Sequence, residues 1–403
     1  MNMNLIKKIS FVLTITLTLL LFSYQNSTAV TVITEKPKVQ LRYNNLLRMP
    51  RNIPQSLFYD SGITIPYPKD GVKGIYVTAE VAATEKFQSV LSVLDKTALN
   101  SIVLDVKDDY GNITLELPSD TWSIAQVTVP YIANTTNFMK QLEQHSVYPI
   151  ARIVTFKDTA FARMRPDLAF RDLDGDIWKS NSGDSFMNPF LKENWERVAE
   201  IAISAAKAGF KDIQLDYVRF PEQFEEVEPF LSYSKGEYEN YSIDSEARVA
   251  AITDFIAFMR DKLAPYGVRL SADIFGYAAT TEQAAGIGQN VSKIAAHVDA
   301  ISSMIYPSHW GTHYFGIDQP DLHPYETIMA YMSIENNLLA KLNPAPLSRP
   351  WLQDFTAAYL GTGNYQEYGP QQVSQQIKAL RDSGVTEYLL WNPEAAYSEG
   401  VDY

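Results

Sequence analysis

The sequence contains no cysteine. This absence excludes disulfide bonds, a thiol nucleophile, a thiolate metal site and a lipid anchor attached through cysteine. Basic residues are also scarce, with 34 Lys and Arg against 47 Asp and Glu, and the net charge is −13. Because a nucleic-acid-binding surface needs a basic patch, we expect no nucleic-acid partner.

The longest apolar run lies near the N-terminus, from Ile9 to Phe22, directly after Lys7 and Lys8. It spans about 14 residues, fewer than the roughly 20 that a membrane-spanning helix needs. Small residues follow at positions 27–29, as at a cleavage site. We therefore predict a signal peptide over residues 1–29 and a secreted or cell-surface protein. If the segment stays uncleaved, it would act as a membrane anchor.

The remaining chain divides by its pattern. Residues 30–70 contain five prolines and little periodicity, which predicts a linker or an N-terminal wrap. Over residues 71–395, strand-like and helical segments alternate, and residues 396–403 form a tail. The expected strands cover 74–80, 101–107, 148–156, 212–220, 269–275, 300–306, 349–355 and 387–392. With seven intervening helices, the pattern predicts an α/β fold, a (β/α)₈ TIM barrel whose eighth helix is short or missing.

Two neighbouring strands of this predicted barrel carry an aspartate towards their C-terminal ends. Asp216 lies in the segment 211–221 and Asp273 in the segment 269–276. Barrel enzymes build their active sites at this end of the strands. Glycoside hydrolysis needs two carboxyl groups, about 5.5 Å apart in retaining enzymes, and neighbouring strands lie about 4.8 Å apart. Asp216 and Asp273 are therefore the candidate catalytic residues, unless one is a structural carboxylate paired with a nearby base.

Other polar and aromatic side chains are expected at the same rim. The candidate substrate-binding residues are Glu80, Asp105, Lys107, Asn188, Arg219, Tyr306, His309, Trp310, Asp354, Trp391 and Asn392. Arg152 is expected there too, without an assigned role. An internal salt-bridge layer is an equal alternative for Glu80 and Lys107, and packing beneath helices is the plainer interpretation for Trp351 and Trp391. Asp354 and Glu394 are alternative acids.

Metal binding is disfavoured. His309 and His313 have the i, i+4 spacing that could bind a metal on a helix. Neighbouring Pro and Gly residues argue against a helix at this place. We expect neither a metal site nor a cofactor.

Several segments resemble the bacterial putative glycosyl hydrolase family, a TIM-barrel family. They are residues 71–77, 103–108, 185–189, 213–221, 271–276, 302–307 and 390–393. The family is similar, more distantly, to the α-amylase and α-galactosidase barrels, whose nucleophile is an Asp ending the fourth strand, the position of Asp216. The α-amylase pattern has an Arg two residues earlier, where Gln214 stands, and a Glu acid on the fifth strand, where Asp273 stands.

Together, the residues and the resemblance predict an exported glycoside hydrolase that acts on a poly- or oligosaccharide by a retaining mechanism. Asp216 would be the nucleophile and Asp273 the general acid/base. Two alternatives remain open. One is a non-catalytic carbohydrate-binding barrel, and the other is a metal-dependent polysaccharide deacetylase or hydrolase that uses His309 and His313.

Overall fold

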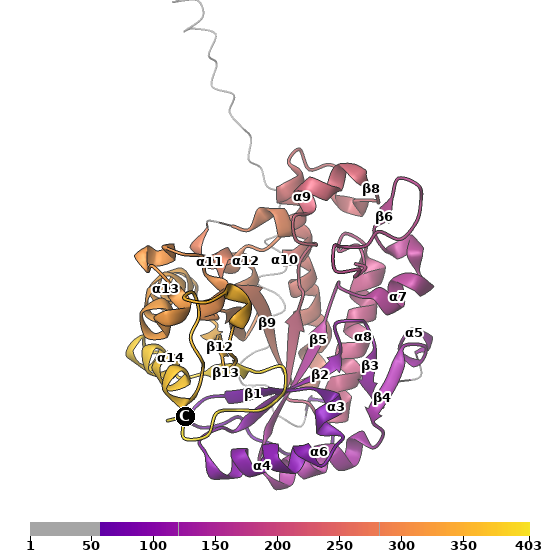
Figure 1. Cartoon of the computed structure of the whole chain (residues 1–403). Helices are drawn as coiled ribbons and strands as arrows, with labels where there is room; N and C mark the ends of the chain where they lie inside the picture. The colour runs from indigo at the N-terminus through magenta and orange to yellow at the C-terminus, as the bar shows by residue number, and fades with distance from the viewer. Residues whose placement is uncertain (1–56, 120, 282) are drawn as a thin grey trace, which may run out of the picture. The chain divides into compact units, whose positions relative to one another are not determined.

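The computed structural model describes residues 57–119, 121–281 and 283–403 (Figure 1). The predicted signal peptide, residues 1–29, lies outside the described residues, as does the predicted linker up to residue 56. Within the described ranges, no helix is both long and apolar enough to cross a membrane.

Eight parallel strands close into a ring, in the order β1, β2, β5, β7, β9, β10, β12, β13 and back to β1. Their bounds are Lys73–Val77, Ser101–Lys107, Tyr148–Val154, Asp212–Asp216, Arg269–Phe275, Ala300–Met304, Trp351–Gln353 and Tyr388–Trp391. Each expected strand is present, and the predicted TIM barrel is confirmed. The strands are buried almost throughout because the ring has side chains inside it and helices around it.

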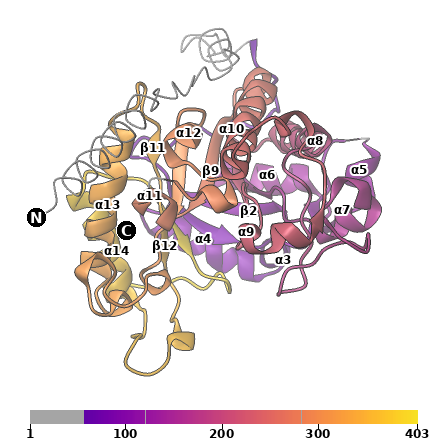
Figure 2. The same cartoon turned by 90° about the horizontal axis from the view of Figure 1, so that it is seen from above.

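Seven helices connect successive strands from outside the ring. They are α4 (Lys86–Lys96), α6 (Thr135–Gln144), α8 (Lys192–Ala208), α10 (Asp244–Leu263), α12 (Val291–Ala295), α13 (Pro324–Leu339) and α14 (Pro370–Asp382). In both views α13 and α14 lie on one side of the strands and α8 on the other (Figures 1 and 2). No helix follows β13 within residues 392–403, so the eighth helix is missing as predicted. The tail packs there instead, with Tyr403 buried and the Tyr397 hydroxyl donating to the carbonyl of Tyr76.

Smaller elements in the loops were not predicted. Beyond β2, the strands β3 (Ile113–Leu115) and β4 (Thr128–Ile132) extend the sheet outside the ring. Two long loops, after β5 and after β7, are joined by an antiparallel pair of two-residue strands, β6 (Arg171–Asp172) and β8 (Leu231–Ser232). Short additions complete the fold: α3 (Ala79–Ala82), α5 (Trp122–Ala125), α7 (Thr159–Met164), α9 (Phe224–Val227), α11 (Tyr277–Thr280) and β11 (Leu347–Ser348).

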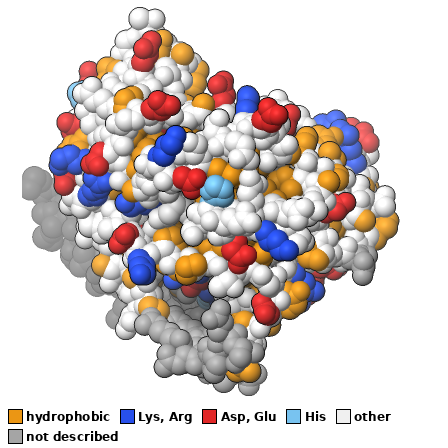
Figure 3. Space-filling view, turned by 90° about the horizontal axis from the view of Figure 1, so that it is seen from below, with side chains coloured by type: hydrophobic (Ala, Val, Ile, Leu, Met, Phe, Trp, Pro, Cys, Tyr) orange, Lys and Arg blue, Asp and Glu red, His pale blue; other side chains and the backbone are white. Residues whose placement is uncertain are grey.

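The closed end of the barrel, where the strands begin, contains a buried ionic cluster. Arg349 donates to Asp212 and to Glu387, each at 2.8 Å, and all three side chains are sealed from solvent. The hydroxyl of Tyr67, in the segment that precedes β1, donates to Glu387 and accepts from Arg349. Residues 57–70 thus pack beneath the barrel floor. Seen from below, on the side of the barrel that carries α4 and α6, the described surface mixes acidic and basic side chains without a patch of one sign (Figure 3).

Candidate active site

Asp216 is the last residue of β7, and the strand ends here rather than at Phe220. Tyr217 has a φ of 48°, a left-handed conformation that a tyrosine adopts only at a cost of about 1–3 kcal/mol. The Tyr217 N–H donates to Asp216 Oδ1 at 2.6 Å, which fixes the carboxylate at the barrel mouth. Strain of this kind persists where the surrounding structure enforces it, often at functional sites.

Asp273 stands beside Asp216 on the neighbouring strand. The pairing of β7 with β9 runs from Asp212↔Arg269 to Leu215↔Ala272, so the next positions in register are the two aspartates. Asp273 is 2% exposed and accepts a hydrogen bond from Trp351 Nε1 at 2.9 Å. Burial raises the pKa of Asp273 well above its usual range, and the nearby charge of Asp216 raises it further. Both effects favour the neutral acid form of Asp273.

Arg152 on β5 is the centre of charge in the mouth. Its guanidinium contacts Asp216 Oδ2 at 2.6 Å, Asp105 Oδ1 at 2.7 Å and Asp109 Oδ1 at 2.9 Å. Burial raises the pKa of Asp105, and Arg152 opposes this effect. Although burial also acts on Asp109, Arg152 and Lys157 lower the pKa of this carboxyl to about 2. Arg152 thus favours the ionised forms of Asp105 and Asp109.

Four aromatic side chains surround these carboxyl groups. Tyr76 stacks on Trp391 with 4.0 Å between ring centroids, and Trp391 meets Trp351 edge to face at 5.5 Å. Trp351 and Trp391 therefore lie inside the barrel. The interpretation that both pack beneath helices is wrong. The Tyr76 hydroxyl donates to Asp105 at 2.5 Å. Tyr306 is 5% exposed, and its burial raises its pKa, as do the charges of Asp273 and Asp216.

Lys107 does not reach the mouth. Its pairing with β5 skips Val106, so that Asp105 faces Arg152 but Lys107 faces Ile153. This bulge turns the side chain to the outer face of the barrel. There, Lys107 Nζ is fully buried, 3.1 Å from Asp158 Oδ2, and donates to the carbonyls of Val154 and Lys157. Lys107 is therefore neither a substrate-binding residue of the mouth nor part of a salt-bridge layer inside the barrel, because its ion pair with Asp158 lies outside the ring.

The structure also places several other predicted substrate-binding residues away from the acids. Glu80 is exposed on α3. Asn188 is buried and joins two loops through the carbonyl of Ser234. Asp354 anchors the C-terminal tail through Ser398, and Asn392 donates to the carbonyl of Asp354. The alternative acid Glu394 is exposed in the turn that follows β13.

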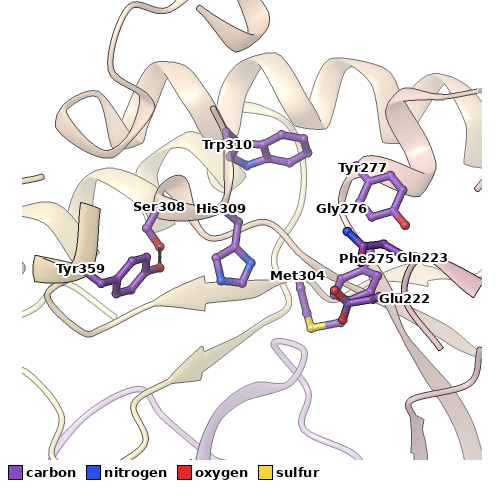
Figure 4. A pocket seen from close by; sticks show the side chains of 10 residues that line it. All are labelled: Glu222, Gln223, Phe275, Gly276, Tyr277, Met304, Ser308, His309, Trp310 and Tyr359. Atoms are coloured by element: carbon purple, nitrogen blue, oxygen red, sulfur yellow. Dashed lines mark hydrogen bonds between the residues drawn. The ribbon is translucent and has the colours of Figure 1, made fainter. Parts of the chain in front are cut away.

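Arg219, His309 and Trp310 gather on one side of the mouth. His309 and Trp310 line an open pocket of about 520 Å³ at the ends of β9 and β10 (Figure 4). Arg219 lies behind it, stacked at 4.7 Å on Phe275, which also lines the pocket. Neither aspartate lines this pocket. The ring of Tyr306 is 4.8 Å from that of His309.

The two histidines do not form a metal site of the helical kind. His309 ends a 3₁₀ turn, whereas His313 is exposed and lies 3.2 Å from Asp318 Oδ1. Nowhere in the described ranges do three or more His, Asp or Glu side chains come together in an arrangement that could hold a metal ion.

For three residues of the mouth, the sequence predicted no function: Tyr76, Asp109 and Arg152. Arg152 alone had a usable signal, because an arginine interrupts the otherwise apolar segment 148–154. Asp109 lies just beyond a strand end, and its position depends on the bulge in β2.

Comparison with known proteins places this geometry in context. Residues 74–397 match the family described as "Putative glycosyl hydrolase domain". The glycoside hydrolase domain of PgaB (BpsB) from Bordetella bronchiseptica is similar with a TM-score of 0.57 and 11% identity, covering 80% of this chain and 96% of that one. A β-galactosidase from the psychrophilic Marinomonas ef1 has a TM-score of 0.56 and 11% identity, covering 81% and 57%. At such identities these structures establish the shared fold.

One further structure has a higher identity over a shorter stretch. A hypothetical protein from Ruminiclostridium thermocellum ATCC 27405 is 28% identical, with a TM-score of 0.43, over 49% of this chain and 96% of that one. No curated protein matches the chain significantly.

Proposed function

The chain belongs to the family of "Putative glycosyl hydrolase" domains, and from this premise we propose that it is a retaining glycoside hydrolase acting on a poly- or oligosaccharide. Asp216 would be the nucleophile and Asp273 the general acid/base. One observation carries the proposal: two carboxyl groups stand side by side in different surroundings. Asp216 accepts hydrogen bonds from Arg152 and the Tyr217 N–H, whereas burial raises the pKa of Asp273. In such enzymes the surroundings of each carboxyl group assign it the role of acid or nucleophile.

The environment of Asp216 suits a nucleophile. Arg152 and the Tyr217 N–H both stabilise its negative charge. In the α-amylase pattern the arginine stands two residues before the nucleophile, at Gln214 here. Gln214 pairs in register with Arg152 on β5, so the neighbouring strand supplies the guanidinium.

The environment of Asp273 suits a general acid. Oδ1 accepts the Trp351 N–H, which leaves Oδ2 for the proton. Asp273 would protonate the glycosidic oxygen while Asp216 attacks the anomeric carbon and forms a glycosyl ester. Asp273, now ionised, would then take a proton from the water that cleaves this ester. Strands about 4.8 Å apart suit the spacing of about 5.5 Å that this two-step route needs.

Trp391 is the candidate platform for the sugar ring at the cleavage point. It is only partly buried, whereas Tyr76 behind it is 6% exposed. A sugar ring presents an apolar face that packs well on an indole. No cofactor takes part in this chemistry.

A second candidate function is a non-catalytic carbohydrate-binding barrel. Near-complete burial of the acids favours it, because Asp216 is 6% and Asp273 2% exposed. Such a protein would bind glycans without releasing new reducing ends.

We also propose that the protein acts outside the cytoplasm. The support is the sequence of residues 1–29, with two lysines before an apolar run. N-terminal sequencing of the secreted protein should begin close to residue 30, and retention of the full-length chain in the membrane would favour the anchor instead.

The catalytic assignment is tested with Asp216→Asn and Asp216→Ala on a glycan panel, by assay of reducing ends. Both variants should lose activity by about a thousandfold or more. Azide should restore turnover to Asp216→Ala, because a small anion can occupy the vacated space. Asp299→Asn is the matched control, since Asp299 pairs with Arg260 just before β10, at the opposite end of the barrel. Full activity in Asp216→Asn would refute the assignment, and glycan binding without any turnover by the unmodified protein would favour the binding barrel.

A further inference from the structure

The pocket beside the mouth is built from the same end of the barrel as the acids. Phe275, Gly276 and Tyr277 come from the end of β9, two residues and more beyond Asp273. His309 and Trp310 come from the loop after β10. Its volume of about 520 Å³ is within the range of small-molecule sites, roughly 300–1,000 Å³. The pocket is thus large enough for one or two sugar rings.

Its aromatic wall is held in place by a close packing contact. A Cβ on Gly276 would stand 2.6 Å from the carbonyl oxygen of Met304 and 2.9 Å from Trp310 Cζ2. Only glycine leaves room for the indole to cross the end of β9. The indole N–H is buried and has no hydrogen-bond partner among the described residues. Tyr277 adds a second ring that is 40% exposed, so a flat ligand can reach it.

The acidic side chain in the pocket wall, Glu222, has a cationic partner. Glu222 accepts from Arg219 at 2.9 Å, and the guanidinium also stacks on Phe275. Part of the His309 side chain is exposed to solvent, and the walls of the pocket surround the rest. The partial loss of water around the imidazole lowers its pKa. At neutral pH it is therefore uncharged and can both donate and accept. Figure 4 shows its ring between Tyr277 on one side and the hydrogen-bonded pair of Ser308 and Tyr359 on the other.

From this combination we infer that the pocket is a second sugar subsite, separate from the cleavage point, that takes a neutral pyranose. Stacking faces would receive the apolar side of the ring, and His309 and Glu222 would bind its hydroxyl groups. The inference rests on the proposed function and extends it. Because neither aspartate lines the pocket, substrate would occupy both places only as an oligosaccharide.

The experiment measures binding without turnover, so that it is independent of catalysis. Full-length protein carrying Asp216→Asn is titrated calorimetrically with malto-, cello- and galacto-oligosaccharides of two to six units. Adding Tyr277→Ala or His309→Ala should weaken binding of the best ligand roughly tenfold, as expected for one lost stacking face or hydroxyl contact. Tyr131→Ala is the matched control, since Tyr131 is 45% exposed on β4, outside the pocket. It should change the affinity by less than about twofold.

Two results would overturn the inference. One is that no oligosaccharide of the panel binds, and the other is that binding is the same in both pocket variants as in the control. Tyr277 and His309 are exposed, so both variants should fold, and an unchanged urea midpoint verifies this. Failure of the proposed function would look different: the unmodified protein would cleave nothing, while the pocket variants could still lose affinity.

Discussion

Replacing Arg152 with methionine is the sharpest test of the electrostatics at the barrel mouth. The change keeps a long, flexible side chain but removes the cation that contacts Asp105, Asp109 and Asp216. Leaving a buried charge without its partner typically costs about 3–5 kcal/mol. Asp109 is 46% exposed in its side chain, so solvent screens that pair and it adds little. The loss should come mainly from Asp105 and Asp216, whose side chains are each 9% exposed.

The pH dependence of this loss identifies its cause. In the unmodified protein, Arg152 and Lys157 hold the pKa of Asp109 at about 2, below its usual 3.8. The ionised Asp109 therefore stabilises the fold fully above pH 3.8, and this contribution is lost as the pH falls through about 2. Burial raises the pKa of Asp105 even beside Arg152, and without Arg152 this pKa would rise further above its unfolded value. A carboxyl group of this kind destabilises the fold at neutral pH, and its protonation removes the penalty as the pH falls. The deficit of Arg152→Met should therefore be largest at pH 7 and smaller at pH 4.5.

The assay is equilibrium unfolding in urea, followed by tryptophan fluorescence at both pH values. Arg381→Met is the control, because Arg381 pairs with Asp402 on the surface, with side chains 43% and 83% exposed. It should cost less than about 1 kcal/mol. A deficit for Arg152→Met that is equal at pH 7 and pH 4.5 would refute the electrostatic explanation and indicate lost packing against the aromatic rings.

Three further outcomes are expected. Gly276→Ala should lower the free energy of unfolding in urea by about 1–3 kcal/mol, because the added Cβ would stand 2.6 Å from a carbonyl oxygen. In the control Gly311→Ala, the added Cβ would meet nothing within 4 Å, and the free energy of unfolding should change by less than about 0.5 kcal/mol. Tyr67→Phe should lower the stability by about 1–3 kcal/mol, because the buried ionic cluster loses a hydroxyl partner. The thermal midpoint should fall accordingly, and an unchanged midpoint would contradict the structural role of residues 57–70. Asp216→Asn should move the titration of Asp273, followed by NMR of its side-chain carboxyl carbon, to lower pH, because one raising charge is gone. An unmoved midpoint would show that the two groups do not interact.

The barrel could be predicted from the sequence because its signals are local. Buried strands leave apolar runs, and helix ends leave glycines such as Gly209, which has a φ of 115° after α8. The strand-end positions of Asp216 and Asp273 followed from the same periodicity, and the register places them side by side.

The surroundings of the acids could not be predicted, because they depend on irregular backbone and on contacts between distant segments. A single skipped residue, Val106, turns Lys107 outward, and no periodicity announces it. The left-handed Tyr217 ends β7 four residues earlier than the apolar pattern suggests. Arg152 gains its importance only when three strands meet, since its partners come from β2, β7 and the turn beyond β2.

The segment under the barrel floor has a practical implication for how the molecule can be attached to anything else. Residues 57–70 reach β1 from the pole opposite the mouth, with the Tyr59 N–H bonded to the Pro265 carbonyl and Lys211 Nζ to that of Ile63. A purification handle or immobilising linker joined ahead of residue 57 would leave the opening unobstructed. At residue 403 a handle would have to preserve the packing of the Tyr403 side chain, which is 8% exposed.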